Sequence, residues 1–159
     1  VYYSLYYTQV ISGVLMISTI PVWIIFISSI LKIEDGKYFL VTPVEKVGIQ
    51  VDDAPFIAVD FHEVITQGEK ALKFETHVGD RVVASSENPI RVERDAITDE
   101  PAPYIHIRNG LDALIDRKTF YRLIDIGQHK NHKNESWFGI ISASTFFPII
   151  KSEELENSI

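Results

Sequence analysis

The first 31 residues contain no Asp, Glu, Lys or Arg, and this feature limits what the chain can fold into more than any other. All 15 basic and 22 acidic residues lie downstream of Leu31. Within this segment, residues 10 to 31 form an apolar run that would be roughly 33 Å long as a helix, against a bilayer core of about 30 Å. A hydrophobic segment of residues 1 to 31 therefore precedes a chain of ordinary polarity.

Several interpretations of this segment stay open. As a membrane helix it would tolerate Pro21, and Lys32 and Lys37 after it would leave the rest of the chain in the cytoplasm by the positive-inside bias. It would also suit a buried helix or strand. A third interpretation is a misread or truncated N-terminus joined to an authentic domain. A signal peptide fits less well, because no basic residue precedes the apolar run.

The overall composition is that of a globular protein and excludes several function classes. Hydrophobic residues make up 46% and charged residues 23% of the chain, so it carries enough apolar surface to fold. The net charge is -7, and no basic cluster offsets it, which argues against nucleic-acid binding. The absence of cysteine excludes disulfides, thiolate zinc sites and cysteine nucleophiles.

Residues 32 to 86 predict a first β lobe. Leu72, Phe74, Thr76 and Val78 alternate with polar residues, which is the period of a strand with one wet face. The sequence from Asp52 to Pro55 predicts a turn. The strands expected in this lobe run through residues 38–42, 44–51, 56–65, 72–78 and 82–83.

Residues 87 to 150 predict a second, α+β lobe, and residues 151 to 159 a frayed tail. Asn109-Gly110 between two alternating runs predicts a tight hairpin. Asp116 then caps one helix, whose apolar face carries Phe120, Leu123 and Ile124. Residues 128 to 136 are polar and predict a loop, and residues 137 to 150 are extended and apolar.

Several of these segments together resemble the bacterial domain-of-unknown-function family 1285. Their order and spacing carry the resemblance, which covers about residues 30 to 149. The segments are YFLVTPVEKV at 38–47, DAPF at 53–56, PYIHIR at 103–108, GLDALIDR at 110–117, FYRL at 120–123 and STFFP at 144–148.

The residue patterns predict an α+β fold with two small, mostly antiparallel β lobes and one clear helix. The resemblance implies that the two lobes have related internal architecture and that the second is loosely similar to a pleckstrin-homology fold. It further implies a soluble bacterial protein, a site between the lobes for a nucleotide-like ligand, and a link to signalling. Upstream of Ile30 the chain departs from the family, whose residues there are polar. A misread or truncated N-terminus is therefore the favoured account of residues 1 to 31, and a membrane anchor the second.

Three cationic residues on or beside turns, Lys46, Arg108 and Arg117, are candidates for binding an anionic ligand. Lys46 follows a predicted strand and, with Thr42 and Glu45, would line a cleft, although a surface Glu-Lys pair is the plainer interpretation. Arg108 precedes the Asn-Gly turn, and Arg117 opens the helix. Because acidic residues are preferred at a helix N-terminus, Arg117 there suggests either a bound anion or an ion pair with a nearby carboxylate.

Three further residues complete the candidate ligand-binding set. Tyr121 would stack on a ligand ring or belong to the core, and Ser144 would donate a hydrogen bond or stand in a plain turn. Asp53 lies in the turn before the third strand. No known catalytic motif is present in the sequence, and no cofactor is expected. His129 and His132 are too sparse a pair for a zinc site, so no metal is expected.

Three functions follow from these residues. The first is a module that binds a small anionic, nucleotide-like ligand between the lobes. The second is an enzyme of unknown reaction that uses Glu45 or Asp53 as a general base. The third is a cytoplasmic module tethered to a membrane by residues 10 to 31. Neither the ligand's identity nor the oligomeric state follows from the sequence.

Overall fold

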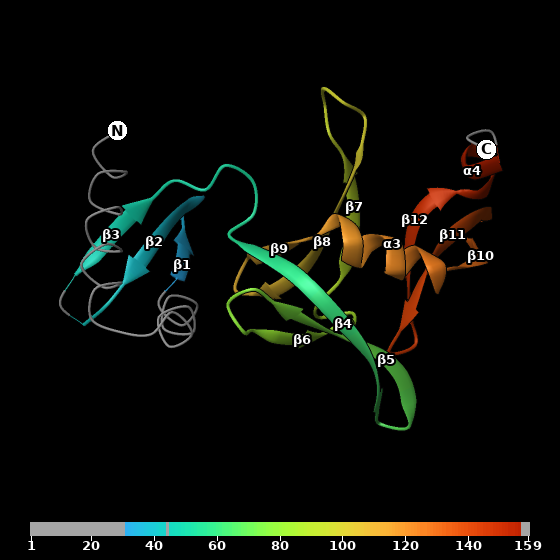
Figure 1. Ribbon diagram of the computed structural model, residues 1–159, viewed down its shortest axis with the longest axis horizontal. Coiled ribbons are helices and arrows are strands. Elements are labelled where there is room, and N and C mark those ends of the chain that lie inside the picture. Colours follow the sequence, from blue (N-terminus) through green and yellow to red (C-terminus); the bar gives the residue numbers. More distant parts are fainter. Residues whose placement is uncertain (1–30, 44, 157–159) are drawn as a thin grey trace.

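The computed structural model describes residues 31–43 and 45–156, which form three β-sheets and two helices. Figure 1 shows a six-stranded sheet in the middle of the molecule, with a three-stranded sheet on either side of it. The predicted α+β class, with mostly antiparallel strands and one clear helix, is confirmed.

The N-terminal sheet is an antiparallel meander of three strands in chain order. A tight turn at Asp35 and Gly36 connects the first two strands, and both residues have positive φ. Leu31 and Leu40 are buried and belong to the same hydrophobic core as the central sheet, so this sheet packs on the rest of the molecule. Its strands are β1 (Leu31–Glu34), β2 (Lys37–Val41) and β3 (Lys46–Ile49).

The central sheet has the strand order β6-β5-β4-β9-β8-β7. Strands β4 and β9 are parallel, and every other pair in this sheet is antiparallel. The boundary that we predicted between residues 86 and 87 falls between β6 and β7, the two edge strands of this one sheet. Its strands are β4 (Phe56–Thr66), β5 (Glu69–Thr76), β6 (Arg81–Val83), β7 (Ile90–Arg94), β8 (Pro101–Arg108) and β9 (Leu111–Ile115).

The C-terminal part adds a helix and a third sheet. Helix α3 (Arg117–Asp125) begins after Asp116, whose carboxylate accepts a hydrogen bond from the Thr119 N–H at 2.7 Å, so the predicted cap is confirmed. An antiparallel sheet follows, and the short helix α4 ends the described residues. These elements are β10 (Gln128–His132), β11 (Glu135–Ser142), β12 (Thr145–Lys151) and α4 (Ser152–Glu156).

A bulge in β4 decides where α3 sits. The register shifts between Ala58 and Asp60, which interrupts the alternation of buried and exposed side chains. After Ala58 the next buried side chain is Phe61, whereas a regular strand would bury residue 60. The Val59 carbonyl accepts a hydrogen bond from the buried Thr119 hydroxyl at 2.8 Å. The bulge therefore supplies the acceptor that fixes the first turn of α3 against β4.

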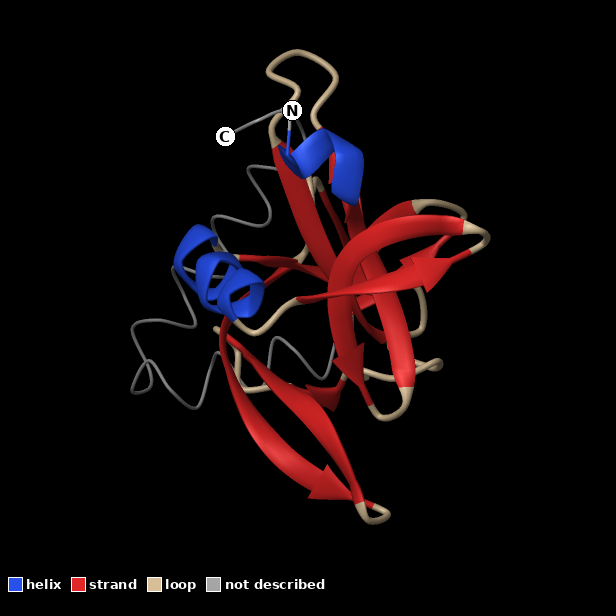
Figure 2. Ribbon diagram, turned by 90° about the vertical axis from the view of Figure 1, so that its right-hand side faces the viewer, coloured by secondary structure: helices blue, strands red, loops and turns tan. Residues whose placement is uncertain are grey.

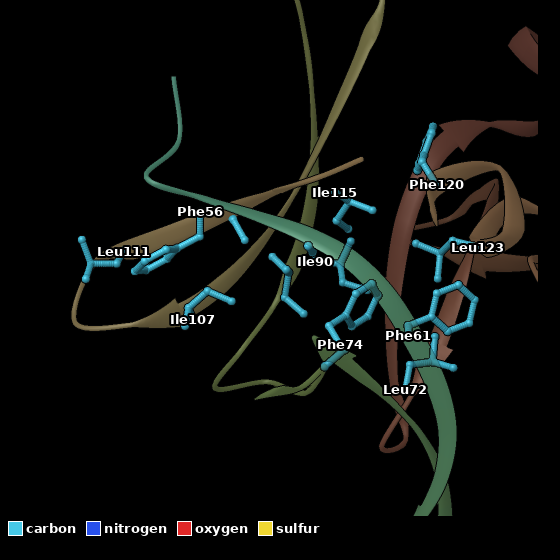
Figure 3. Packing of buried hydrophobic residues seen from close by; sticks show 14 of the residues in the cluster. Phe56, Phe61, Leu72, Phe74, Ile90, Ile107, Leu111, Ile115, Phe120 and Leu123 are labelled. Carbon is cyan, nitrogen blue, oxygen red and sulfur yellow. The ribbon is translucent and has the colours of Figure 1, made fainter. Parts of the chain in front are cut away.

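One hydrophobic core runs through all three sheets. Phe61 and Phe74 pack with ring centroids 5.6 Å apart, and Leu123 of α3 lies beside them (Figure 3). Phe56 lies farther along β4, close to Ile107 and Leu111 of the β8–β9 hairpin. Figure 2 shows the long strands bending strongly, so the sheet curls around these side chains.

The predicted hairpin at Asn109-Gly110 is confirmed, because both residues have positive φ, 49° and 76°. The loop that we predicted for residues 128 to 136 is wrong: these residues form β10, a turn at Lys133 and Asn134, and the start of β11. Strand β10 is an almost fully exposed edge strand, so its sequence lacks the alternation that marks a half-buried strand. Within the predicted tail, Lys151 ends β12 and residues 152–156 form α4.

The uncharged segment of residues 10 to 31 lies outside the described residues, apart from Leu31, which begins β1. Among the helices of the described residues, none has the length and apolar character needed to cross a membrane.

Ser142 joins the third sheet to the central one. Its hydroxyl is fully buried, accepts a hydrogen bond from the Leu72 N–H at 2.8 Å and donates one to the Ala84 carbonyl at 2.7 Å. The next residue adds a backbone hydrogen bond, from the Ala143 N–H to the Lys70 carbonyl at 3.1 Å. The apolar sequence around Ser142 gave no sign of this bridge.

We expect Ser142→Ala to lower the free energy of unfolding by about 2 kcal/mol, because it leaves a buried N–H and a buried carbonyl without this partner. Urea denaturation measures the change. Ser86→Ala is the matched control, since Ser86 is exposed, and it should change stability by less than about 0.5 kcal/mol. An equal, small effect of both substitutions would contradict the bridging role.

Candidate functional site

A cavity of about 530 Å³ lies where the N-terminal sheet meets the central sheet, and we call it the inter-sheet cavity. Three parts of the chain form it: the N-terminal sheet, residues 50–55, and the start of β4 with its neighbours. Most of the lining is apolar. The lining residues are Leu31, Leu40, Ile49, Gln50, Val51, Asp52, Asp53, Ala54, Pro55, Phe56, Ile57, His77, Val78 and Leu114.

Residues 50–55, which we call the linker segment, connect β3 to β4 and contain no strand or helix. They supply most of the polar groups of the cavity lining. The Gln50 side-chain amide donates a hydrogen bond to the Asp52 carboxylate at 3.2 Å. Asp52 and Asp53 bring two carboxylates to one wall, so this wall accepts hydrogen bonds.

Tyr104 on β8 holds the linker segment from the other side. Its hydroxyl donates a hydrogen bond to the Asp53 carboxylate at 2.7 Å, although the residue is only 9% exposed. Burial, and then the hydrogen bond to Asp53, raise the pKa of Tyr104 to about 12. Tyr104 is the register partner of Leu114, a lining residue, and therefore projects from the same face of the sheet.

Polar side chains continue across this face from Tyr104. The Arg91 guanidinium lies over the Tyr104 ring, 4.7 Å from its centroid, and pairs with the Asp112 carboxylate at 2.8 Å. Asp112 also contacts the Nδ1 atom of His106 at 2.9 Å. These residues, Arg91, Tyr104, His106 and Asp112, form a connected group that we call the outer-face network.

His77 adds a hydrogen-bond donor to the lining. Its Nδ1 atom accepts a hydrogen bond from the Ile57 N–H at 3.1 Å. A ring nitrogen that accepts carries no proton, so the neutral ring has its proton on Nε2, which is left to donate. The cavity lining therefore combines acceptors in the linker segment with a donor from the turn after β5.

All eight predicted site residues lie in the described part of the chain, and the structure spreads them over several places. Asp53 lines the inter-sheet cavity. Arg108 is not part of the lining, and its guanidinium lies 6.0 Å from the ring centroid of Phe56, a lining residue. Arg108 also lies 3.9 Å from the Asp80 carboxylate.

Thr42, Glu45 and Lys46 lie together at the turn between β2 and β3. The Thr42 hydroxyl donates to the Glu45 carbonyl at 3.1 Å and accepts from the Glu45 N–H at 3.0 Å, so it closes the turn. Lys46 pairs with Glu34 on β1, and its ammonium lies 4.3 Å from the Phe39 ring centroid. These three residues are not part of the cavity lining.

The remaining three residues lie elsewhere. Arg117 begins α3, is 72% exposed at its side chain and pairs with Glu100 at 3.3 Å. Tyr121 is 61% exposed on the same helix. Ser144 has a φ of 60° in the turn between β11 and β12, and its hydroxyl donates to Glu69. Of the eight predicted residues, the structure therefore places only Asp53 in the lining of the inter-sheet cavity.

Two features bear on the other predicted chemistries. Glu45 is exposed at the β2–β3 turn while Asp53 lines the cavity, so the two predicted general bases do not share a wall. Among the described residues, no group of three or more His, Asp or Glu side chains is arranged to hold a metal ion. The Nδ1 atom of His129 instead contacts the Ser152 hydroxyl at 2.8 Å.

Sequence analysis missed Tyr104, His77 and Arg91. A signal for Tyr104 was present, because Tyr104 and His106 alternate with the apolar Ile105 and Ile107 along β8. An aromatic residue on the polar side of a strand indicates a contact across that face. His77 and Arg91 carry no comparable signal, since the Ile57 N–H, the Tyr104 ring and the Asp112 carboxylate that they contact come from other strands.

Comparisons with known proteins place the chain in a family. A model described as "Protein of unknown function (DUF1285), C-terminal domain" matches residues 55–149, and its N-terminal counterpart matches residues 21–54. The chain therefore belongs to the DUF1285 family, as the resemblance predicted. The match begins at residue 21, upstream of the start that we predicted near residue 30, and the two models meet within the linker segment.

Two solved structures are similar to this chain. A DUF1285 family protein from Silicibacter pomeroyi DSS-3 is 52% identical with a TM-score of 0.75, and the match covers 87% of this chain and 74% of that one. A DUF1285 family protein from Shewanella baltica OS155 is 28% identical with a TM-score of 0.49, covering 68% of this chain and 79% of that one. The search of curated proteins gave no match.

We expect one of the seven tyrosines to titrate near pH 12 in the folded protein, and this group to be missing in Tyr104→Phe. Because the pKa is raised, the folded state favours the neutral phenol. Its stabilising contribution is complete below the ordinary value of 10.0 and is lost as the pH rises through about 12. Absorbance titration of the unmodified protein and of Tyr104→Phe measures the tyrosine pKa values. If the substitution instead removes a tyrosine that titrates near pH 10, the raised pKa does not belong to Tyr104.

Proposed function

We propose that this protein is a binding module for a small anionic, nucleotide-like ligand, which lies in the inter-sheet cavity. The observation that carries the proposal is the cavity itself, because its volume of about 530 Å³ suits a small organic molecule. Its lining is mostly apolar with a few polar groups, which is the usual character of small-molecule sites. The bacterial signalling role implied by the resemblance, and a cytoplasmic location, belong to the same proposal.

The chemistry of the lining supports a ligand with a ring and several hydrogen-bond donors. Ile57 and Leu114 offer apolar surface to a ring system. The carboxylates of Asp52 and Asp53 are acceptors for hydroxyl or amino groups, such as those of a sugar or a base. The acidic wall therefore suits the neutral part of a nucleotide.

Arg108 supports an anionic group at the edge of the cavity. A guanidinium forms paired hydrogen bonds with phosphate or carboxylate oxygens. A bound phosphate would share the guanidinium with the Asp80 carboxylate, which lies 3.9 Å away. The Nε2 atom of His77 is a second donor for the same anion.

A thermal-shift screen with mono-, di- and cyclic nucleotides tests the proposal. A ligand present at 100 times its Kd stabilises the folded state by about 2.7 kcal/mol, so we expect a concentration-dependent rise in Tm. Ala54→Phe should remove the shift, because Ala54 lines the cavity and the larger side chain fills it. Ala96→Phe, in an exposed loop, is the control and should keep it.

We expect Arg108→Ala to weaken binding of the stabilising nucleotide by about 1 to 3 kcal/mol, the usual contribution of a hydrogen bond to a charged group. Calorimetric titration measures the change. Arg117→Ala tests the other predicted anion contact, and we expect it to have little effect, because the Arg117 side chain is 72% exposed and pairs with Glu100. Absence of any shift across all nucleotides with the unmodified protein would overturn the proposal.

A further inference from the structure

The linker segment lacks the support that secondary structure gives to the other parts of the cavity. Residues 50–55 form no strand or helix, while the remaining lining residues belong to strands or to the turn after β5. A wall without a ladder of backbone hydrogen bonds depends on side-chain contacts for its position. The position of the linker segment also determines where the carboxylates of Asp52 and Asp53 lie in the cavity lining.

The contact that crosses from the linker segment to the central sheet is the hydrogen bond between Tyr104 and Asp53, at 2.7 Å. Tyr104 is 9% exposed, so the donor has little freedom to move, while the acceptor Asp53 is an exposed residue of the linker segment. Hydrogen bonds to an ionised acceptor are the stronger kind, which makes this a firm attachment for a loop.

Tyr104 is itself held on its other side. The Arg91 guanidinium covers its ring at 4.7 Å and is fixed by two carboxylates, Asp112 at 2.8 Å and Glu93 at 2.7 Å. Strand β7 contributes Arg91 and Glu93, and β9 contributes Asp112. The outer-face network therefore locks one ring orientation of Tyr104 from two neighbouring strands.

We infer that Tyr104 is a positioning residue for the inter-sheet cavity: it holds the linker segment in place through Asp53, and the outer-face network holds Tyr104. The expected effect of Tyr104 on ligand affinity rests on the proposed function. The position of the linker segment, in contrast, can be measured without a ligand. The two are therefore tested separately.

Limited proteolysis with a protease that cleaves before Asp tests the position of the linker segment. We expect Tyr104→Phe to raise the cleavage rate before Asp52 about three- to tenfold, the factor that corresponds to a lost hydrogen bond. Mass spectrometry assigns the cleavage sites. Tyr121→Phe is the matched control, because Tyr121 is an exposed tyrosine on α3, and it should leave the rate unchanged.

Substitutions of Asp53 sharpen this experiment. Asp53→Asn keeps a side-chain oxygen that can accept the hydrogen bond from Tyr104. The protease should therefore cleave this variant before Asp52 more slowly than it cleaves Asp53→Ala. In Tyr104→Phe, Asp53→Ala should add little further increase, since the bond is already lost. Additive effects of the two substitutions would show that they act independently and would overturn the inference.

The remaining outcomes are decisive as well. An unchanged rate before Asp52 in Tyr104→Phe would overturn the inference, and so would a parallel rise at every Asp site, because that reports loss of global stability. With a nucleotide found by thermal shift, Tyr104→Phe should also raise Kd about three- to tenfold. If no nucleotide binds the unmodified protein, the proposed function fails, and the cleavage rates alone still decide the role of Tyr104.

Discussion

The parallel pairing of β4 with β9 joins residues 56–58 to residues 113–115 and so brings two distant parts of the chain into one sheet. Parallel neighbours require a crossover connection, and here the chain supplies the outer strands β5 to β8 between them. The pairing brings Phe56, Ile57 and Leu114 together in the lining of the inter-sheet cavity. Phe56 is also part of the hydrophobic core.

The same strand pair connects the cavity to the rest of the fold. The linker segment leads directly into β4, and β4 then passes through the bulge that accepts α3. The tip of the β8–β9 hairpin meets the N-terminal sheet, where a Cβ at Gly110 would lie 3.4 Å from a methyl group of Ile33. The cavity is therefore bounded by contacts that the fold already needs for its stability.

Local patterns in the sequence predicted the elements that depend on local chemistry. The Asn109-Gly110 hairpin and the Asp116 cap were both correct, because each requires particular residues at fixed spacing. Strand β10 escaped prediction because it is polar on both faces and pairs with a single strand, β11. Such a strand is specified by its partner and not by its own periodicity.

The site was harder to predict, because its groups come from separate elements. Asp53 and Arg108 were predicted, but Tyr104 and His77 were not, since the partner of each is 20 or more positions away in the sequence. Arg117 was notable in the sequence as a cation at a helix N-terminus. In the structure it pairs with the carboxylate of Glu100, which lies in the loop between β7 and β8. Sequence patterns identify unusual residues but do not identify their distant partners.

Chemical-shift mapping by NMR tests the central claim, that the inter-sheet cavity is where this protein binds its ligand. An isotope-labelled sample is titrated with the nucleotide that gives the largest thermal shift. The account predicts saturable changes at backbone amides of the linker segment, Ile57, His77 and Leu114, all of which line the cavity. Saturable changes confined to the start of α3 or to the β2–β3 turn, with the cavity residues unaffected, would contradict it.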